Sequence, residues 1–144
     1  MNYTIWSDVF ICPSCGKEIV LWKESVDLNN NNIKEKFPCP HCGYECSKKN
    51  MEKSWETSYD PIIHEPTKTI KKIPVANNVS TPIRGDFKLS TKDFDLLKQV
   101  EDVRNDNYIG PIPDGDESHR NYSIGFYHVH QLFTRRNHLY LSRV

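Results

Sequence analysis

The sequence has no long hydrophobic run and no excess of charge of either sign. No stretch of its 144 residues approaches the ~18 apolar residues that a membrane-spanning helix needs, and Met1–Trp6 lacks the charged and apolar regions of a secretory signal. Nineteen Lys and Arg balance nineteen Asp and Glu, so composition gives no argument for nucleic acid or an anionic membrane. These absences predict a soluble, cytoplasmic protein without a membrane partner.

The chain is also poor in apolar residues and in recognisable catalytic motifs. Apolar residues make up 37% and the mean hydropathy is −0.68, so a rich autonomous core is not expected and a two-lobed organisation stays open. There is no Gly-rich loop between a strand and a helix, no GxSxG, no HExxH and no P-loop. We therefore expect no catalytic residues in this chain.

What the sequence does contain is a repeated cysteine motif. Four of the five cysteines stand in the frames Cys12-Pro13-Ser14-Cys15-Gly16 and Cys39-Pro40-His41-Cys42-Gly43. A two-residue gap lets both thiolates of a tight turn face one cation, and the following glycine permits the left-handed backbone that the turn needs. Cys12, Cys15, Cys39 and Cys42 are therefore predicted to bind a tetrahedral, structural Zn²⁺, whose binding energy of about 10–16 kcal/mol exceeds the roughly 3 kcal/mol cost of closing the intervening loop.

Alternatives for the metal motif remain open at this point. Disulfides would suit a secreted protein, but two Cys-x-x-Cys pairs in a chain without a signal peptide favour a metal. Cys46 could exchange with Cys42 as a ligand or remain a free, partly buried thiol, and His41 is expected to be exposed at the tip of its turn.

The hydrophobic pattern predicts a small α+β fold. Alternating β-formers predict strands at Tyr3–Ile11 and Glu18–Val26, with a solvated loop at Asn29–Asn32 and a return strand or irregular segment at Tyr44–Trp55. Residues 1–56 are thus predicted to form a zinc ribbon, in which the cysteine turns lie at the ends of short β-hairpins.

Residues 57–144 are predicted to form a small linking region with about two helices. Four prolines between Glu56 and Arg84 exclude a long helix and leave short extended pieces, of which Thr69–Val75 is the best candidate strand. Ser90 and an apolar stripe predict a helix over residues 91–104, and Thr134 would cap a second one, Arg135–Val144. Between the helices we expect a loop at Asn107–Tyr122 and a strand at Ser123–Gln131.

The last 27 residues carry basic and histidine side chains that could bind a ligand. Residues 118–144 contain four arginines and no acidic residue. His128 and His130 would lie on one side of the expected strand, where they could chelate a metal or form structural hydrogen bonds. Because the final helix has no stop signal, we expect the chain to be part of a longer protein.

Several of these segments together resemble a known family. They are Ile-Trp-Ser-Asp-Val at 5–9, the two cysteine motifs, Ile-Pro-Asp-Gly-Asp-Glu at 112–117, and the block His128-Val-His-Gln-Leu-Phe-Thr-Arg-Arg-Asn137. This order is similar to the interior of zinc-ribbon-containing, site-specific DNA methyltransferases of bacteria, which methylate adenine N6 or cytosine N4. The resemblance covers nearly the whole chain, and its specificity rests mainly on the 128–137 block.

The resemblance implies a non-catalytic region whose parent enzyme carries the activity. Neither the Gly-containing loop for S-adenosylmethionine (AdoMet) nor the (Asp/Asn/Ser)-Pro-Pro-aromatic turn occurs here, so AdoMet would bind only in the parent enzyme. The region would aid DNA binding or pack on the rest of the methyltransferase chain. Its candidate phosphate contacts, which could instead pair with acidic groups or pack on the missing catalytic domain, are Arg120, Arg135, Arg136 and Arg143.

Two other interpretations belong to different functional classes. The chain could be a free-standing zinc-ribbon module that binds nucleic acid or a protein partner, or a purely structural insertion with no ligand beyond zinc. Duplex DNA titration and metal analysis distinguish these interpretations.

Overall fold

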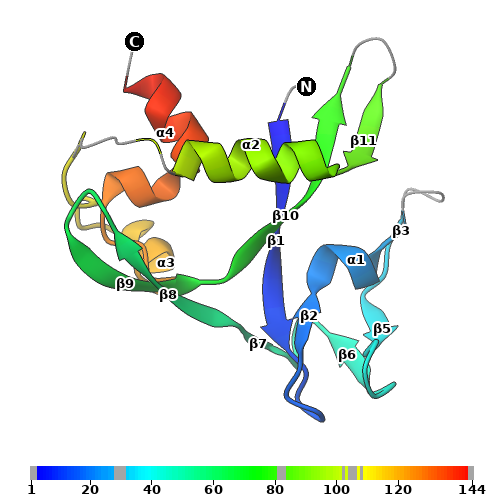
Figure 1. Ribbon diagram of the computed structural model, residues 1–144. Helices are drawn as coiled ribbons and strands as arrows, with labels where there is room; N and C mark the ends of the chain where they lie inside the picture. Colours follow the sequence, from blue (N-terminus) through cyan, green and yellow to red (C-terminus); the bar gives the residue numbers. More distant parts are fainter. Residues whose placement is uncertain are drawn as a thin grey trace. The chain divides into compact units, whose positions relative to one another are not determined.

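The computed structural model describes residues 3–27, 32–80, 84–101, 103, 107 and 109–142. Over these residues the fold is mixed α+β, with antiparallel strand pairs and four α-helices (Figure 1). Contacts divide the chain into unit 1, Met1–Trp55 with Ile70–Leu89, and unit 2, Glu56–Thr69 with Ser90–Val144. The expected division after residue 56 differs from this one because Ile70–Leu89 belongs with the first unit. No helix of the described part is both long and apolar enough to cross a membrane.

Unit 1 is built on one long strand, β1 (Tyr3–Ile11), as the alternating sequence predicted. It pairs at one end with β10 (Lys72–Val79) and at the other with β2 (Glu18–Val20) and β7 (Glu52–Lys53). β11 (Gly85–Lys88) pairs with the free side of β10. Figure 1 shows β1 and β10 side by side along much of their length.

The proline-rich segment forms longer strands than its composition predicted. β10 contains Pro74, and the candidate strand Thr69–Val75 is split between β10 and the preceding β9 (Glu65–Ile70). A β-bulge explains how β10 accommodates the proline: the register shifts between Ile5, opposite Ala76, and Trp6, opposite Pro74. A residue without an N–H is tolerated at such an irregularity.

The expected strand Glu18–Val26 is wrong beyond Val20. The chain forms a short helix, α1 (Leu21–Ser25), because the Trp22 amide donates to Ser7 Oγ and Ser25 Oγ donates back to the Leu21 carbonyl. Two hairpins follow, and their strands are β3 (Val26–Asp27) with β4 (Asn32–Ile33), and β5 (Lys36–Pro38) with β6 (Glu45–Ser47). Of the expected Asn29–Asn32 loop, Asn32 belongs to β4 and the rest lies outside the described residues.

The core of unit 1 lies around the cysteines. Phe10 from β1, Ile19 from β2 and Phe37 from β5 are at most 3% exposed. They pack with three buried cysteines and Met51. The metal motif is therefore part of the hydrophobic core rather than an appendage to it.

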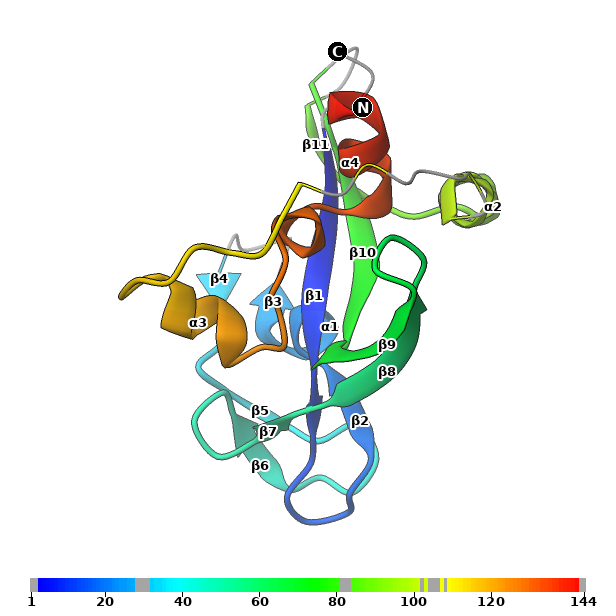
Figure 2. The same ribbon diagram turned by 90° about the vertical axis from the view of Figure 1, so that its left-hand side faces the viewer.

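Unit 2 contains a two-stranded hairpin and most of the helices (Figure 2). Strand β8 (Trp55–Asp60) pairs with β9 to form the hairpin. The helical elements of this unit are α2 (Thr91–Glu101), α3 (Ser118–Tyr122), the 3₁₀ helix η1 (Val129–Leu132) and α4 (Arg135–Leu141).

The two predicted helices of this region are confirmed, with shorter ends. At the start of α2, the Asp93 carboxylate accepts hydrogen bonds from the Ser90 amide and hydroxyl. At the start of α4, Thr134 Oγ1 accepts from the Asn137 amide, which confirms the predicted cap. The expected helix end at residue 104 and the C-terminal residues 143–144 lie outside the described part of the chain.

Two expectations between these helices are wrong. The loop Asn107–Tyr122 includes α3, and the strand Ser123–Gln131 is instead a turn followed by η1. Gly125 has a φ of +85° and lies so close to the Lys68 carbonyl that a Cβ would not fit. Helices of one turn are too short to create a periodic sequence pattern, which is why the sequence predicted about two helices where the described residues form four.

Candidate functional site

The two cysteine motifs form nearly identical turns. In each, the glycine amide donates to the first cysteine's carbonyl at 2.9 Å, and the glycine has a φ of +69° or +75°. The first cysteine's amide in turn donates to the carbonyl of Lys17 or Tyr44. Glycine has no Cβ and adopts such φ values at little steric cost, so the predicted role of Gly16 and Gly43 is confirmed.

The four sulfur atoms lie together at distances suited to a single ion. Cys12 Sγ is 3.8 Å from Cys42 Sγ, and Cys15 Sγ is 3.8 Å from Cys39 Sγ. All four lie within 4.8 Å of one another. A tetrahedral ion with metal–sulfur bonds of about 2.3 Å separates its ligands by about 3.8 Å, whereas a disulfide brings sulfurs to about 2.05 Å. The cluster could therefore hold a metal ion such as zinc.

The environment of Cys12 favours its thiolate. Burial works to raise its pKa, but hydrogen bonds from the Cys15 and Ser14 backbone and from neighbouring thiols outweigh burial and lower the pKa to about 6. A thiolate is the form that binds a metal. A backbone hydrogen bond at Lys17 works to lower the pKa of Cys15, but burial and hydrogen bonds with the other thiols raise it to about 11. The first negative charge of the cluster therefore resides on Cys12.

Cys46 and His41 lie beside the cluster but outside the four-sulfur group. Cys46 is fully buried in the core, with Sγ 4.0 Å from Cys12 Sγ. His41 is exposed, and its Nε2 lies 3.3 Å from the Glu18 carbonyl. Both positions agree with the simpler of the alternatives left open by the sequence.

Replacing Cys46 is expected to weaken the core without removing the metal. Cys46→Ala removes one buried sulfur atom and should lower the free energy of unfolding by roughly 1–2 kcal/mol, while the bound metal stays at one ion per chain. Thermal unfolding and metal analysis of the same sample measure the two effects. A Cys46→Ala protein that binds no metal would show that Cys46 is a ligand.

The described arginine candidates have different environments. Arg120 on α3 is exposed and lies 3.5 Å from Glu117, whereas Arg136 is half-buried. Arg135 Nη2 donates to the Val103 carbonyl at 2.7 Å, and its Nε is buried. Arg143 lies outside the described residues. Arg135 thus has an internal structural contact, while Arg120 is the most accessible of the three.

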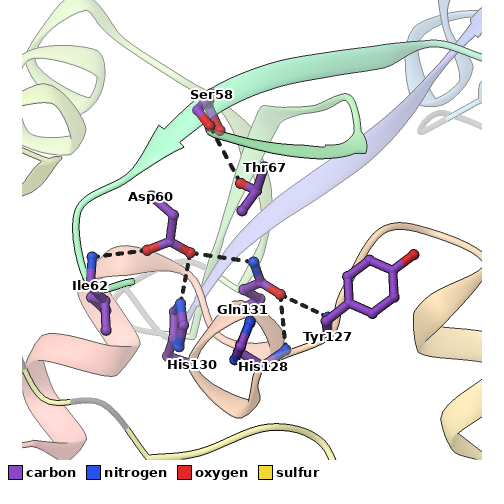
Figure 3. A network of polar contacts seen from close by, with 8 residues as sticks. All are labelled: Ser58, Asp60, Ile62, Thr67, Tyr127, His128, His130 and Gln131. Atoms are coloured by element: carbon purple, nitrogen blue, oxygen red, sulfur yellow. Dashed lines mark hydrogen bonds and ion pairs between the residues drawn. The ribbon is translucent and has the colours of Figure 1, made fainter. Parts of the chain in front are cut away.

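A second polar cluster, centred on Asp60, occurs in unit 2 (Figure 3). The carboxylate accepts hydrogen bonds from the Ile62 amide at 3.0 Å, His130 Nε2 at 2.7 Å and Gln131 Nε2 at 3.3 Å. Burial works to raise the pKa of Asp60, but these bonds, led by that of His130, lower it below its usual value. The sequence did not predict this pair, because its members are 70 residues apart and nothing in either segment points to the other.

The histidines do not form the chelate suggested by their spacing. His130 is 6% exposed and bonded to Asp60, and its ring centroid lies 5.7 Å from that of His128 and 6.0 Å from that of His138. Among the residues that the structure describes, only the cysteines place three or more potential ligand atoms close together. The structural alternative for His130 is the one observed.

A pocket of about 210 Å³ lies beside the Asp60 cluster. Its wall includes His130, His138 and Arg135 together with Phe126 and Phe133. The carboxylate accepts three hydrogen bonds and the two histidines are almost fully buried, so Asp60 joins chain segments at the edge of this pocket.

Comparison with protein-family models, with curated proteins and with solved structures finds no match to this chain.

Proposed function

We propose that Cys12, Cys15, Cys39 and Cys42 bind one structural Zn²⁺ and that unit 1 is a zinc ribbon. The observation that supports this most strongly is the pair of 3.8 Å sulfur separations, which match the edge of a tetrahedral four-sulfur zinc site. Four protein sulfurs leave no coordination position for water or substrate, so the ion stabilises the fold and does not take part in hydrolysis.

We further propose that the chain is a non-catalytic region that serves a DNA methyltransferase by binding DNA or by packing on the catalytic domain. The sequence resemblance supports the family, and the basic C-terminal segment supports contact with phosphates. Arg120 and Arg136 are the contacts that we propose. Arg135 contributes by holding the start of α4, since its guanidinium is bound to the Val103 carbonyl.

Electrophoretic mobility shift with duplex DNA tests the DNA-binding role. If the arginines neutralise phosphates, affinity for the metal-loaded protein should fall steeply between about 50 and 200 mM salt, and each lost contact should reduce the log–log salt slope by about 1. We expect Arg120→Ala and Arg136→Ala to reduce the slope. Arg84→Ala, which removes a described, exposed arginine of unit 1, serves as the matched control.

Two results would reject the phosphate role. The first is an affinity for duplex DNA that is undetectable, or that is equal at about 50 and 200 mM salt. The second is a change of the salt slope in Arg84→Ala as large as that in Arg120→Ala. Neither result affects the zinc proposal, because metal content is measured separately.

A further inference from the structure

Asp60 holds different segments of unit 2 together through one buried carboxylate. It stands at the end of β8, bonds the Ile62 amide in the turn that leads to β9, and accepts from His130 and Gln131 in η1. Gln131 Oε1 in turn accepts from the Tyr127 and His128 amides. The hairpin and η1 are therefore joined by contacts that depend on the charge of Asp60 (Figure 3).

Most of the ionisable groups next to the Asp60 carboxylate are groups that carry a positive charge when protonated. His128 and His138 both lie near His130, with ring centroids 5.7 and 6.0 Å from its own, and α4 also carries Arg135 beside the same pocket. Because the Asp60 carboxylate already accepts three hydrogen bonds, protonation of a buried histidine beside it would add a charge that is costly to bury.

The other elements supply little compensation. α2 packs against α4, and the described ionisable side chains of α2, β9 and α3 are half-buried or exposed. They are Lys92, Asp93, Asp95, Lys98, Glu65, Lys68, His119, Arg120 and Tyr122.

We propose that His138, next to the Asp60–His130 pair, operates a proton-dependent clamp within unit 2. The clamp is closed while Asp60 binds His130 and His138 is neutral, and it holds η1 and α4 against the β8–β9 hairpin. Protonation of His138 opens it, because the new buried charge lies beside Arg135 and near a carboxylate that already accepts three hydrogen bonds. The device is independent of the proposed DNA role.

The direction of the pH effect follows from the environment of His138. Its ring is 2% exposed, and burial together with the nearby His130 and Arg135 lowers its pKa, although a backbone hydrogen bond to Asn107 and the charge of Asp60 oppose the shift. In the released state His138 regains an ordinary histidine pKa of about 6.5, so it binds a proton more readily than in the closed state. Closure is therefore fully favoured above about pH 6.5 and weakens as the pH falls below that value.

Amide hydrogen exchange and histidine NMR on the full, zinc-loaded chain test the clamp. If a single histidine has an ordinary pKa only in the released state, its protonation can increase the opening equilibrium by at most about tenfold at pH 5.5. We therefore expect amide exchange over residues 126–142 to rise roughly fivefold between pH 7.5 and 5.5. The exchange rates are first corrected for the intrinsic pH dependence of amide exchange. Amides of β1 and β10 in unit 1 should show no such rise. The His138 ring signals of the closed protein should titrate at lower pH than those of an ordinary histidine, because burial lowers the pKa of this ring.

Two variants distinguish opening of the clamp from a general loss of stability in acid. His138→Gln should abolish the pH-dependent rise, and His119→Gln, which removes an exposed histidine of the same unit, should leave it unchanged. Should His138→Gln not fold, the wild-type data decide alone. Corrected exchange over residues 126–142 that stays constant to pH 5.5, or that rises equally in folded His138→Gln, overturns the proposal.

Discussion

Removing the metal is expected to unfold unit 1. Two of the proposed ligands, Cys12 and Cys39, are core residues that pack with Phe10, Ile19 and Phe37, so a bound ion and the core would hold the same segments. Structural zinc contributes about 10–16 kcal/mol, which equals or exceeds the typical stability of a whole domain, about 5–15 kcal/mol. Chelation should therefore abolish slow amide exchange at Phe10 and Phe37, and added zinc should restore it.

A matched pair of cysteine variants separates loss of the metal from loss of packing. Cys39→Ser is expected to reproduce the effect of chelation, because three sulfurs no longer complete the site. Cys46→Ala removes an equally buried sulfur that we place outside the site, and it should keep the metal and the protected amides. Zinc-saturated chelator controls for direct effects of the reagent. Metal-free protein with unchanged protection at Phe10 would contradict the account.

Asp60→Ala is expected to have the second largest effect, a loss of about 3–5 kcal/mol of stability localised to unit 2. The substitution leaves the Ile62 amide, His130 and Gln131 without their shared acceptor, and buried donors that lose their partner are costly. Exchange protection over η1 and α4 measures the loss, with β1 as the internal reference.

The control for this variant is Asp95→Ala, which removes an exposed carboxylate from α2 in the same unit. It should change stability by no more than about 0.5 kcal/mol. Equal effects of the two substitutions would show that the Asp60 cluster does not hold η1 against the hairpin.

The features that the sequence predicted are those encoded locally. The two Cys-x-x-Cys-Gly motifs form turns of the same local geometry, and the ion that we propose would join them independently of the chain between them. β1 follows from its alternating pattern, while α2 and α4 follow from an apolar stripe and from caps at Ser90 and Thr134.

The features that it missed depend on contacts between distant residues or on very short elements. Asp60 and His130 are 70 residues apart, Pro74 is accommodated by a bulge against β1, and α3 and η1 span only five and four residues. In each case tertiary contacts determine a conformation that the local sequence pattern does not predict or predicts wrongly.

The structure also gives a physical role to the segment on which the family resemblance mainly rests. Within residues 128–137, His130 and Gln131 bind Asp60, and Thr134 caps α4. In this chain the block organises unit 2 through these contacts, which require no direct contact to DNA. The mobility-shift experiment is therefore the evidence on which the DNA role depends.

X-ray absorption at the zinc edge, with metal quantification on the same purified protein, tests the central claim most directly. We predict one zinc per chain, surrounded by four sulfur atoms at about 2.3 Å with no nitrogen or oxygen ligand. A first shell that contains nitrogen or oxygen, or a protein that retains no metal and forms disulfides between these cysteines, would contradict it.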